Sequence, residues 1–248
     1  MDKALSDLID EIANLPPNWH RAGSVSRKVL HAIAIHAERI GTIRHSVETG
    51  SGRTTLLFSH LSASHLVFAK DDGESISVVK KSHLFKSDHV TYIEGPNQVT
   101  LPRYTFNHKV QMALIDGPHG YPFPDLEYYY LYPLIETGGL ILLDDIQIPS
   151  ITRMYEIIKM DDMFNLLEVV GNMAFFSRSG APLIDPLSDS WWLQGYNRAH
   201  YEEISGSPSV SSTTWGLMNS VAKNVPGPLK KLVPERVKKL LRGRSRSR

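Results

Sequence analysis

The chain has 248 residues, 42% of them hydrophobic and none of them cysteine, with a formal net charge of +1. This composition is typical of a globular protein of one or two domains, and it excludes a disordered chain, a disulfide scaffold and a cysteine-ligated zinc site. The longest apolar run covers only residues 138–143, and acidic residues near the N-terminus argue against a targeting peptide, so we expect a cytoplasmic protein.

Two amphipathic helices are predicted before the first strand. Leucine and isoleucine recur every three or four residues over residues 4–15, and this helix must stop at Pro16. A second helix is expected over residues 26–40, with Gly41 as its C-terminal stop. We assign residues 1–41 to an N-terminal helical cap, which is a candidate for a lid over a ligand or for an oligomer contact.

From residue 42 onward, β-prone runs alternate with helical stretches. Strands are expected at residues 42–48, 65–69, 89–94, 110–116 and 139–144, and helices at residues 54–61, 74–84, 125–135 and 151–164. This alternation predicts parallel βαβ units, because a parallel return needs a crossover. Two further runs, residues 166–170 and 173–177, are joined by Gly171-Asn172 and predict an antiparallel hairpin. The expected fold is α/β, with a doubly wound, mostly parallel sheet closed by this hairpin, in a core of residues 42–179.

The C-terminal part of the chain changes composition twice. Residues 180–228 form a variable segment rich in aromatic residues and serine. Residues 229–248 contain nine Lys or Arg against one acid, Glu235, so this tail has a net charge of +8 and the rest of the chain −7. Apolar residues fall on one face of the tail, which predicts a basic amphipathic helix. Its candidate roles are a solvated appendage, contact with an anionic membrane surface as a peripheral protein, or, less favoured, contact with nucleic acid.

A glycine-rich turn follows the first predicted strand. The segment reads Glu48-Thr49-Gly50-Ser51-Gly52, and its glycines allow a tight turn and close approach of the backbone to a ligand. The second strand is followed by Asp71-Asp72, at the distance along the chain where a carboxylate accepts hydrogen bonds from a ribose. Together they indicate a ligand that contains a nucleoside; the alternative for the two acids is a solvated turn before a helix.

The glycine turn is not a dinucleotide fingerprint, because the third glycine of Gly-x-Gly-x-x-Gly is missing. Its Glu-x-Gly-x-Gly pattern instead resembles the class I S-adenosylmethionine-dependent methyltransferases, over residues 43–178. That family has a Rossmann-like, seven-stranded sheet. The runs Ile-Asp-Gly-Pro-His-Gly-Tyr at residues 115–121 and Gly-Gly-Leu-Ile-Leu-Leu-Asp-Asp at residues 138–145 look like the small-molecule O-methyltransferases of the catechol O-methyltransferase-like branch.

The resemblance implies a cofactor site. In the family, the glycine turn holds the methionine part of S-adenosylmethionine (SAM), the acid after the second strand holds the ribose, and the loop after the third strand contacts adenine. Lys70 stands where the ribose acid often lies, so this role falls to Asp71 or Asp72. The expected cofactor-binding residues are Glu48, Thr49, Gly50, Ser51, Gly52, Asp71, Asp72, Gly95, Asn97 and Asp116.

Acids at neighbouring strand ends suggest a second site. Asp116, Asp144 and Asp145 match the positions at which catechol-type relatives hold Mg²⁺, which orients the acceptor hydroxyl and favours its deprotonated form. The alternative makes Asp116 a cofactor or substrate contact and Asp144 a helix-capping acid. His119 lies where metal-dependent relatives carry a lysine base, so His119, with Asp116, is the candidate for the catalytic base; otherwise it only shapes the pocket.

The favoured function is methyl transfer from SAM to a small-molecule acceptor, at a hydroxyl group. His119, a metal ion at Asp116, Asp144 and Asp145, or both would activate the acceptor. Two alternatives remain: an oxidoreductase with a nucleotide cofactor, and a non-catalytic, membrane-associated binding protein with the same fold. A homodimer is a further candidate assembly.

Overall fold

The computed structural model describes residues 2–20, 25–70 and 75–205. Its contacts divide the chain into two units, Met1–Pro186 and Leu187–Arg248, which are described separately here. The first unit ends at Pro186, slightly beyond the boundary expected at residue 179. No helix among the described residues combines the length and the apolar composition that a bilayer-spanning helix needs.

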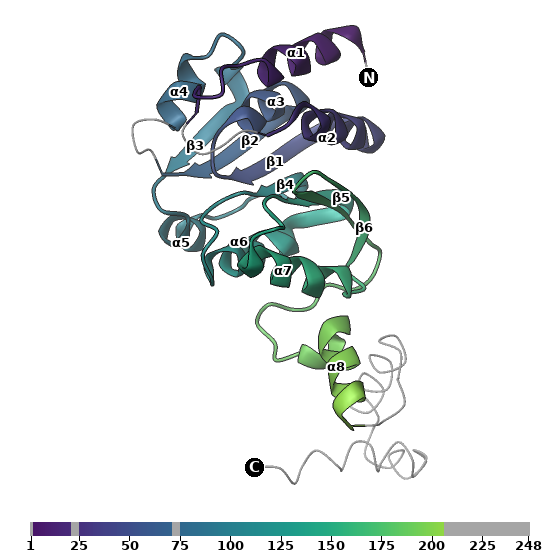
Figure 1. Cartoon of the computed structure of the whole chain (residues 1–248). Coiled ribbons are helices and arrows are strands. Elements are labelled where there is room, and N and C mark those ends of the chain that lie inside the picture. Colours follow the sequence, from purple (N-terminus) through teal and green to yellow (C-terminus); the bar gives the residue numbers. More distant parts are fainter. Residues whose placement is uncertain (1, 21–24, 71–74, 206–248) are drawn as a thin grey trace. The chain divides into compact units, whose positions relative to one another are not determined.

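The first unit is built around one seven-stranded sheet (Figure 1). The strand order is β3-β2-β1-β4-β5-β7-β6, and the first five strands along the chain pair in parallel. β7 runs antiparallel to both of its neighbours, β5 and β6, so the expected closing hairpin is confirmed. The strands are β1 (Ile43–Thr49), β2 (Ser62–Ala69), β3 (Val90–Glu94), β4 (Val110–Ile115), β5 (Ile135–Leu143), β6 (Phe164–Val170) and β7 (Met173–Arg178).

Helices cover both faces of this sheet, which confirms the doubly wound α/β fold (Figure 1). The helices of this unit are α1 (Lys3–Ala13), α2 (Arg27–Ile40), α3 (Arg53–Leu61), α4 (Ile76–Lys81), α5 (Asn97–Thr100), α6 (Phe123–Leu131) and α7 (Pro149–Lys159). Short 3-10 turns occupy Ser87–His89, Leu101–Arg103 and Tyr132–Leu134. The two N-terminal helices begin at the side-chain caps Asp2 and Ser26, which accept hydrogen bonds from Leu5 N and Val29 N.

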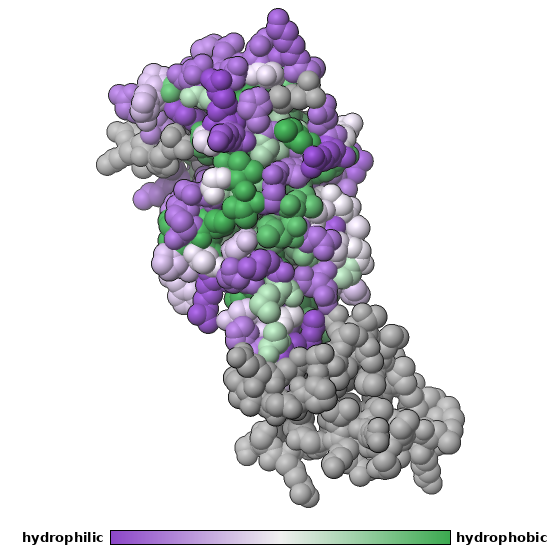
Figure 2. Space-filling model, turned by 45° about the vertical axis from the view of Figure 1, so that its right-hand side comes forward, coloured by the Kyte–Doolittle hydropathy of each residue, from purple (hydrophilic) through white to green (hydrophobic). Residues whose placement is uncertain are grey.

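The core lies in two layers, one on each side of the sheet. All six residues of β4 are buried, and they alternate between the layers because successive strand side chains point to opposite faces. Met112 and Leu114 pack in the layer beneath α1, α2 and α3. Ala113 and Ile115 pack in the layer beneath α6 and α7. Polar side chains (purple in Figure 2) cover much of the visible surface of the described residues, with apolar groups (green) between them.

The boundary between α6 and β5 differs from the expectation. The sequence suggested a helix over residues 125–135 and a strand from residue 139, whereas α6 ends at Leu131 and β5 begins at Ile135. Pro133 explains the early end, because proline has no backbone N–H with which to continue the α-helical hydrogen bonds, and the chain goes on as the 3-10 turn Tyr132–Leu134. After the buried Ile135, β5 is exposed at Thr137 and Gly138, and its pairing with β4 shifts register between Val110 and Met112. No continuous apolar pattern therefore marks this part of the strand.

The second unit contains a short 3-10 turn, Trp191–Leu193, and the helix α8 (Gly195–Ser205). Aromatic rings pack together here: the Trp191 ring lies 6.2 Å from that of Trp192 and 5.7 Å from that of Tyr201, centroid to centroid. These contacts involve the aromatic residues that the sequence analysis placed in its variable segment. The remainder of that segment after residue 205, and the whole basic tail of residues 229–248, lie outside the described residues.

Candidate functional site

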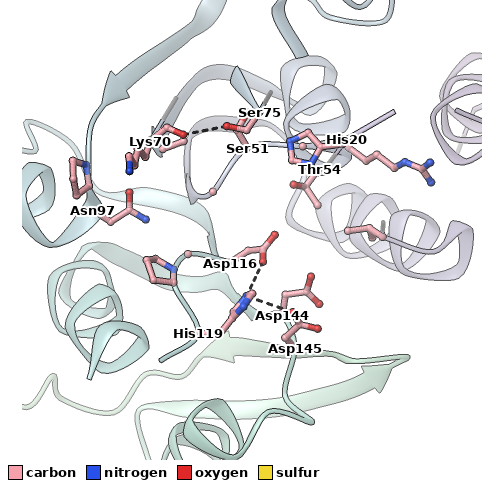
Figure 3. A pocket seen from close by; sticks show the side chains of 18 of the residues that line it. His20, Ser51, Thr54, Lys70, Ser75, Asn97, Asp116, His119, Asp144 and Asp145 are labelled. Carbon is pink, nitrogen blue, oxygen red and sulfur yellow. Dashed lines mark hydrogen bonds and ion pairs between the residues drawn. The ribbon is translucent and has the colours of Figure 1, made fainter. Parts of the chain in front are cut away.

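A cavity of about 590 Å³ lies where the strands of the first unit end (Figure 3). Its walls come from the glycine turn after β1, the end of β2, the start of α5, the loop after β4 and the end of β5. In a doubly wound sheet this edge, at the carboxyl ends of the strands, is where ligands bind. The volume is in the range of small-molecule sites.

The glycine turn forms one wall of this cavity through Gly50, Ser51 and Gly52. Gly50 has φ +88°, and its N–H donates to the Phe68 carbonyl oxygen at 2.8 Å. A Cβ atom at Gly50 would lie 2.3 Å from the carbonyl oxygen of Asp116, so a side chain cannot be accommodated without a shift of the backbone. The turn is therefore packed directly against the loop that carries Asp116.

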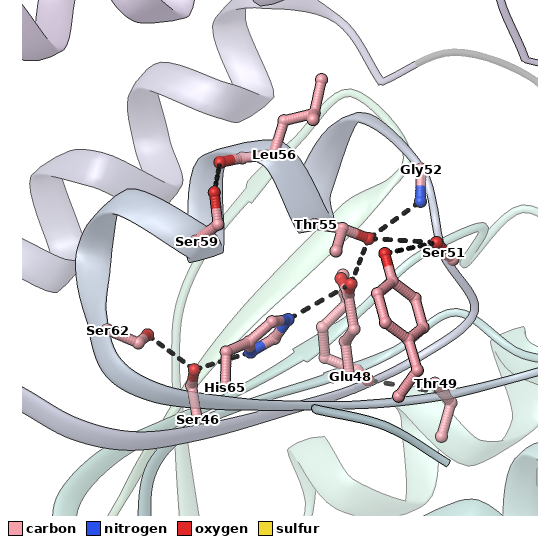
Figure 4. A network of polar contacts seen from close by, with 12 residues as sticks. Ser46, Glu48, Thr49, Ser51, Gly52, Thr55, Leu56, Ser59, Ser62 and His65 are labelled. Atoms are coloured by element: carbon pink, nitrogen blue, oxygen red, sulfur yellow. Dashed lines mark hydrogen bonds and ion pairs between the residues drawn. The ribbon is translucent and has the colours of Figure 1, made fainter. Parts of the chain in front are cut away.

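Glu48 and Thr49 lie behind the turn rather than among the described residues that line the cavity. Glu48 is fully buried and accepts a hydrogen bond from the Thr55 hydroxyl, whose oxygen accepts from Gly52 N at 2.9 Å. Its Oε1 also lies 3.3 Å from Nε2 of His65 (Figure 4). Glu48 thereby holds the end of the turn in place from below, and its expected role in binding the cofactor would be indirect.

The end of β2 contributes Ala69 and Lys70 to the cavity. Ser75 donates to the Lys70 carbonyl oxygen at 3.1 Å. The two expected ribose ligands, Asp71 and Asp72, fall outside the described residues. Their role remains a prediction.

The loop after β3 forms the next wall. Gly95 N–H donates to the Ala69 carbonyl oxygen at 2.9 Å, and Pro96, Asn97 and Gln98 line the cavity. The Asn97 side chain is buried, and its amide nitrogen donates to Oε1 of Glu127 at 2.7 Å. Asn97 thus lies at the cavity wall, while Gly95 lies behind it.

Asp116, His119 and Asp145 come together on the opposite side of the cavity (Figure 3). One ligand atom from each lies within 4.8 Å of the others. Nε2 of His119 is 3.6 Å from Oδ1 of Asp116 and 3.4 Å from Oδ2 of Asp145. Asp144 also lines the cavity but is not in this group of three.

The acids of this cluster repel one another in a partly buried place. Burial raises the pKa of Asp116 to about 6 and that of Asp144 to about 7, and the neighbouring carboxylates add to both shifts. The nearby Asp116 carboxylate raises the pKa of His119, and the charges of Asp145 and Asp144 add to this shift. A positive charge in this cluster would relieve the repulsion, so its electrostatics favour either a protonated His119 or a bound cation.

The backbone holds these side chains in an unusual arrangement. Asp145 has φ +54° and is the one residue other than glycine with a positive φ in the described part of the chain. Asp residues tolerate this region better than most, and such conformations gather at functional sites. Gln147 Nε2 donates to Oδ1 of Asp145 at 2.7 Å, and the Ser150 hydroxyl donates to the His119 carbonyl oxygen.

Sequence reasoning missed two residues at this site. His20 lines the cavity beside Gly52, and nothing in its local pattern signals this position. Glu127 is buried on α6 with Pro124 and Leu131, at helical spacing. An acid inside an apolar helical stripe is a recognisable signal, because burying a carboxylate is costly unless hydrogen bonds compensate.

Comparison with known proteins matches part of the core to a family model. Residues 47–146 match the model of a family described as a methyltransferase domain. No curated protein sequence matches the chain.

Solved structures share the fold at low sequence identity. The O-methyltransferase TomG from Streptomyces achromogenes, involved in tomaymycin synthesis and in complex with SAM, is 14% identical, with a TM-score of 0.53 over 73% of this chain and 91% of its own. An O-methyltransferase from Bacillus cereus in complex with S-adenosylhomocysteine (SAH) is 14% identical, with a TM-score of 0.52 over 72% and 92%. The MycE methyltransferase of the mycinamycin biosynthetic pathway, in complex with Mg and SAH, is 16% identical, with a TM-score of 0.50 over 74% and 58%.

These findings confirm the resemblance on which the sequence interpretation rested. The glycine turn lies at a cavity on the expected edge of the sheet, the sheet closes with the expected hairpin, and the matched region runs from the end of β1 to just beyond β5. Residues 47–146 therefore match a methyltransferase domain, and the first unit has the fold of class I methyltransferases.

Proposed function

We propose that this protein transfers the methyl group of SAM to a hydroxyl group of a small-molecule acceptor. The observation that carries the proposal is one cavity with two chemically different walls. The glycine turn lies on one side, and the cluster of Asp116, His119 and Asp145 lies on the other. The fold shared with TomG and with the Bacillus cereus enzyme supports the choice of an O-methyltransferase.

In this proposal the cofactor lies along the ends of β1, β2 and β3. Gly50, Ser51 and Gly52 bind its methionine part, where the first N–H groups of α3 lack helical partners and can meet the carboxylate. The ribose falls to Asp71 or Asp72, and the adenine to the loop that contains Asn97. The sulfonium methyl group would then face the Asp116 side of the cavity.

The acid cluster would activate the acceptor hydroxyl. Nε2 of His119 can accept the hydroxyl proton, and the two flanking carboxylates stabilise the imidazolium that results. Methyl transfer is an in-line displacement, so the further work of these residues is to keep acceptor oxygen, methyl carbon and sulfur collinear.

Two carboxylates and an imidazole are also a chemically suitable donor set for a divalent cation. A bound Mg²⁺ would supply Lewis-acid stabilisation of the deprotonated acceptor oxygen. The Mg in the MycE complex supports this option. The sequence analysis proposed Asp116, Asp144 and Asp145 as ligands; the geometry favours His119 as the third group, with Asp144 close by.

A ligand test separates this function from its alternatives. A ligand that binds only the folded state raises the melting temperature, so SAM and SAH should stabilise the protein and NAD should not. Stabilisation by NAD alone would instead favour a nucleotide-cofactor oxidoreductase. Binding of SAH without methyl transfer to any of a panel of phenols, sugars and other small-molecule hydroxyl compounds would favour a non-catalytic binding protein.

Two further features stay predictions. One is a homodimer. The other is contact between residues 229–248 and an anionic membrane surface, for which the basic amphipathic pattern of the tail is the support.

A further inference from the structure

A carboxylic acid lies directly behind the cavity wall. Glu127, on α6, is only 1% exposed and packs among the core residues that cover one face of the sheet. A buried carboxylate needs hydrogen-bond donors to replace water. Its partners therefore show what holds it there.

Two side chains from different elements donate to this carboxylate. The Asn97 amide donates to Oε1 at 2.7 Å and the Thr49 hydroxyl donates to Oε2 at 2.7 Å, while the backbone of Gly117 lies against the same carboxylate. A Cβ atom at Gly117 would lie 1.8 Å from Oε1. Only glycine at position 117 lets the carboxylate come this close.

These groups lie at the walls of the cavity or, for Thr49, directly behind them. Thr49 ends β1, Asn97 begins α5, and Gly117 follows β4. The Thr49 hydroxyl oxygen in turn accepts from the backbone N–H of Asp116 at 3.0 Å. Glu127 thus joins the loop that carries Asp116 to the loop that carries Asn97.

The contact with Glu127 fixes which end of the Asn97 amide faces the ligand. The amide nitrogen is used by the carboxylate, so the oxygen is left on the other side. This Oδ1 atom is buried and has no hydrogen-bond partner within the described part of the chain, although Asn97 lines the cavity (Figure 3). A buried acceptor without a donor is unfavourable, so the wall is built for a ligand that donates a hydrogen bond.

We propose that Glu127 is a positioning residue that fixes the Asn97 amide so that its oxygen accepts a hydrogen bond from the 6-amino group of the cofactor's adenine. The inference rests on the proposed function, because it takes the nucleoside of SAM as the ligand. Glu127 itself does not touch the cofactor. It acts through Asn97 and sets the preference of the site for a donor at this position.

The ionised form of Glu127 suits this role, because the Asn97 amide and the Thr49 hydroxyl both donate to it. Burial raises the pKa of Glu127 to about 7, despite the hydrogen bonds that lower it. Binding should therefore be measured at about pH 8, where the carboxylate is ionised.

The probe is the S-inosyl analogue of SAH, in which a carbonyl oxygen replaces the 6-amino group. Calorimetry of the full-length protein should show that SAH binds about tenfold or more tightly than this analogue. The reason is that the carbonyl oxygen of the analogue would face the Asn97 oxygen, and neither atom can donate a hydrogen bond. Glu127→Met, which has a similar length and no acceptor, should lose most of this preference. Glu136→Met is the matched control, because Glu136 pairs with Arg44 at the far end of the sheet.

Glu127→Gln separates positioning from general damage to the fold. The glutamine oxygen can still accept from Asn97, while its amide donates to Thr49, whose hydroxyl then turns to the Leu114 carbonyl oxygen 3.4 Å away. This variant should keep most of the preference for SAH. Asn97→Ala should lose it, and that variant decides the matter if Glu127→Met fails to fold.

The outcomes distinguish this inference from the proposed function. Equal binding of the two ligands by the parent protein overturns the inference, and so does an unchanged preference in Asn97→Ala or in folded Glu127→Met. In each of these cases SAH still binds and the methyltransferase proposal stands. If SAH does not bind the parent protein at all, the proposed function fails first.

Discussion

Replacing Gly50 with alanine tests the packing of the glycine turn against the Asp116 loop. The residue has φ +88°, and the new Cβ would lie 2.3 Å from the Asp116 carbonyl oxygen and 3.2 Å from its carbon. The left-handed conformation costs a non-glycine residue about 1–2 kcal/mol, and forced overpacking adds about 1–3 kcal/mol. The free energy of unfolding should therefore fall by about 2–5 kcal/mol in Gly50→Ala.

Gly138→Ala is the matched control for the backbone term. Gly138 has φ +83°, but nothing lies within 4 Å of its added Cβ. This variant should lose only about 1–2 kcal/mol, and the restriction that alanine imposes on the unfolded chain is common to both variants. The difference between the two variants isolates the clash with Asp116.

Urea denaturation and calorimetry with SAH together measure both consequences. A shift of the Asp116 loop deforms the cavity, so the affinity of Gly50→Ala for SAH should fall at least about tenfold, a change of about 1.4 kcal/mol, while Gly138→Ala binds normally. Equal destabilisation of the two variants would refute the steric argument. Normal SAH affinity in folded Gly50→Ala would remove the glycine turn from the cofactor site.

Three further predictions concern the cation, the buried acid and the tail. Mg²⁺ should raise the melting temperature of the parent protein, and EDTA should reverse this increase. Asp145→Asn should abolish the response to Mg²⁺, and it keeps a side chain that tolerates φ +54°. If the parent protein shows no response, His119 is left as the base without a cation. Burial raises the pKa of Glu127 from 4.5 to about 7, so the folded state binds this proton more tightly than the unfolded chain. The free energy of unfolding should then fall as the pH rises through that interval, and Glu127→Gln should flatten the fall in denaturation profiles; an identical profile would contradict this. Deletion of residues 229–248 should preserve the affinity for SAH and abolish salt-sensitive sedimentation with anionic vesicles. A truncated protein that still sediments with these vesicles would disprove the prediction for the tail.

The fold could be predicted because its central strands carry an unambiguous pattern. β4 is buried on both faces, and the apolar run that reveals it ends at Asp116, so both the strand and the edge at which it stops were readable. The hairpin of β6 and β7 was also readable, because Gly171, which has a positive φ, marks the turn between the two strands. The error at the start of β5 arose where the strand is exposed and irregular, since a strand there has neither alternation nor continuous burial.

The sequence predicted which loops form the site, but it did not predict which side chains in those loops contact one another. Chain order alone places Gly50 and Asp116 at one edge of the sheet, because parallel strands end together. It does not show that Glu48 faces away from the cavity, nor that Asp145 rather than Asp144 joins His119, because these depend on the direction in which the backbone turns at each strand end. Glu127 was missed because it reaches the site from a helix far along the chain.

The buried polar network beneath the glycine turn also has a consequence for how two strands align (Figure 4). Ser46 is the register partner of His65, its hydroxyl lies 2.8 Å from Nδ1 of that residue, and it donates to the Ser62 hydroxyl at 2.6 Å. A slip of two residues would keep each side chain on its own face of the sheet, so alternation alone does not exclude it. Such a slip would leave the Glu48 carboxylate without His65 inside an apolar layer, at a large cost in free energy. The network therefore fixes the register of β1 against β2. It thereby also fixes how far Gly50 and Lys70 project at the rim of the cavity.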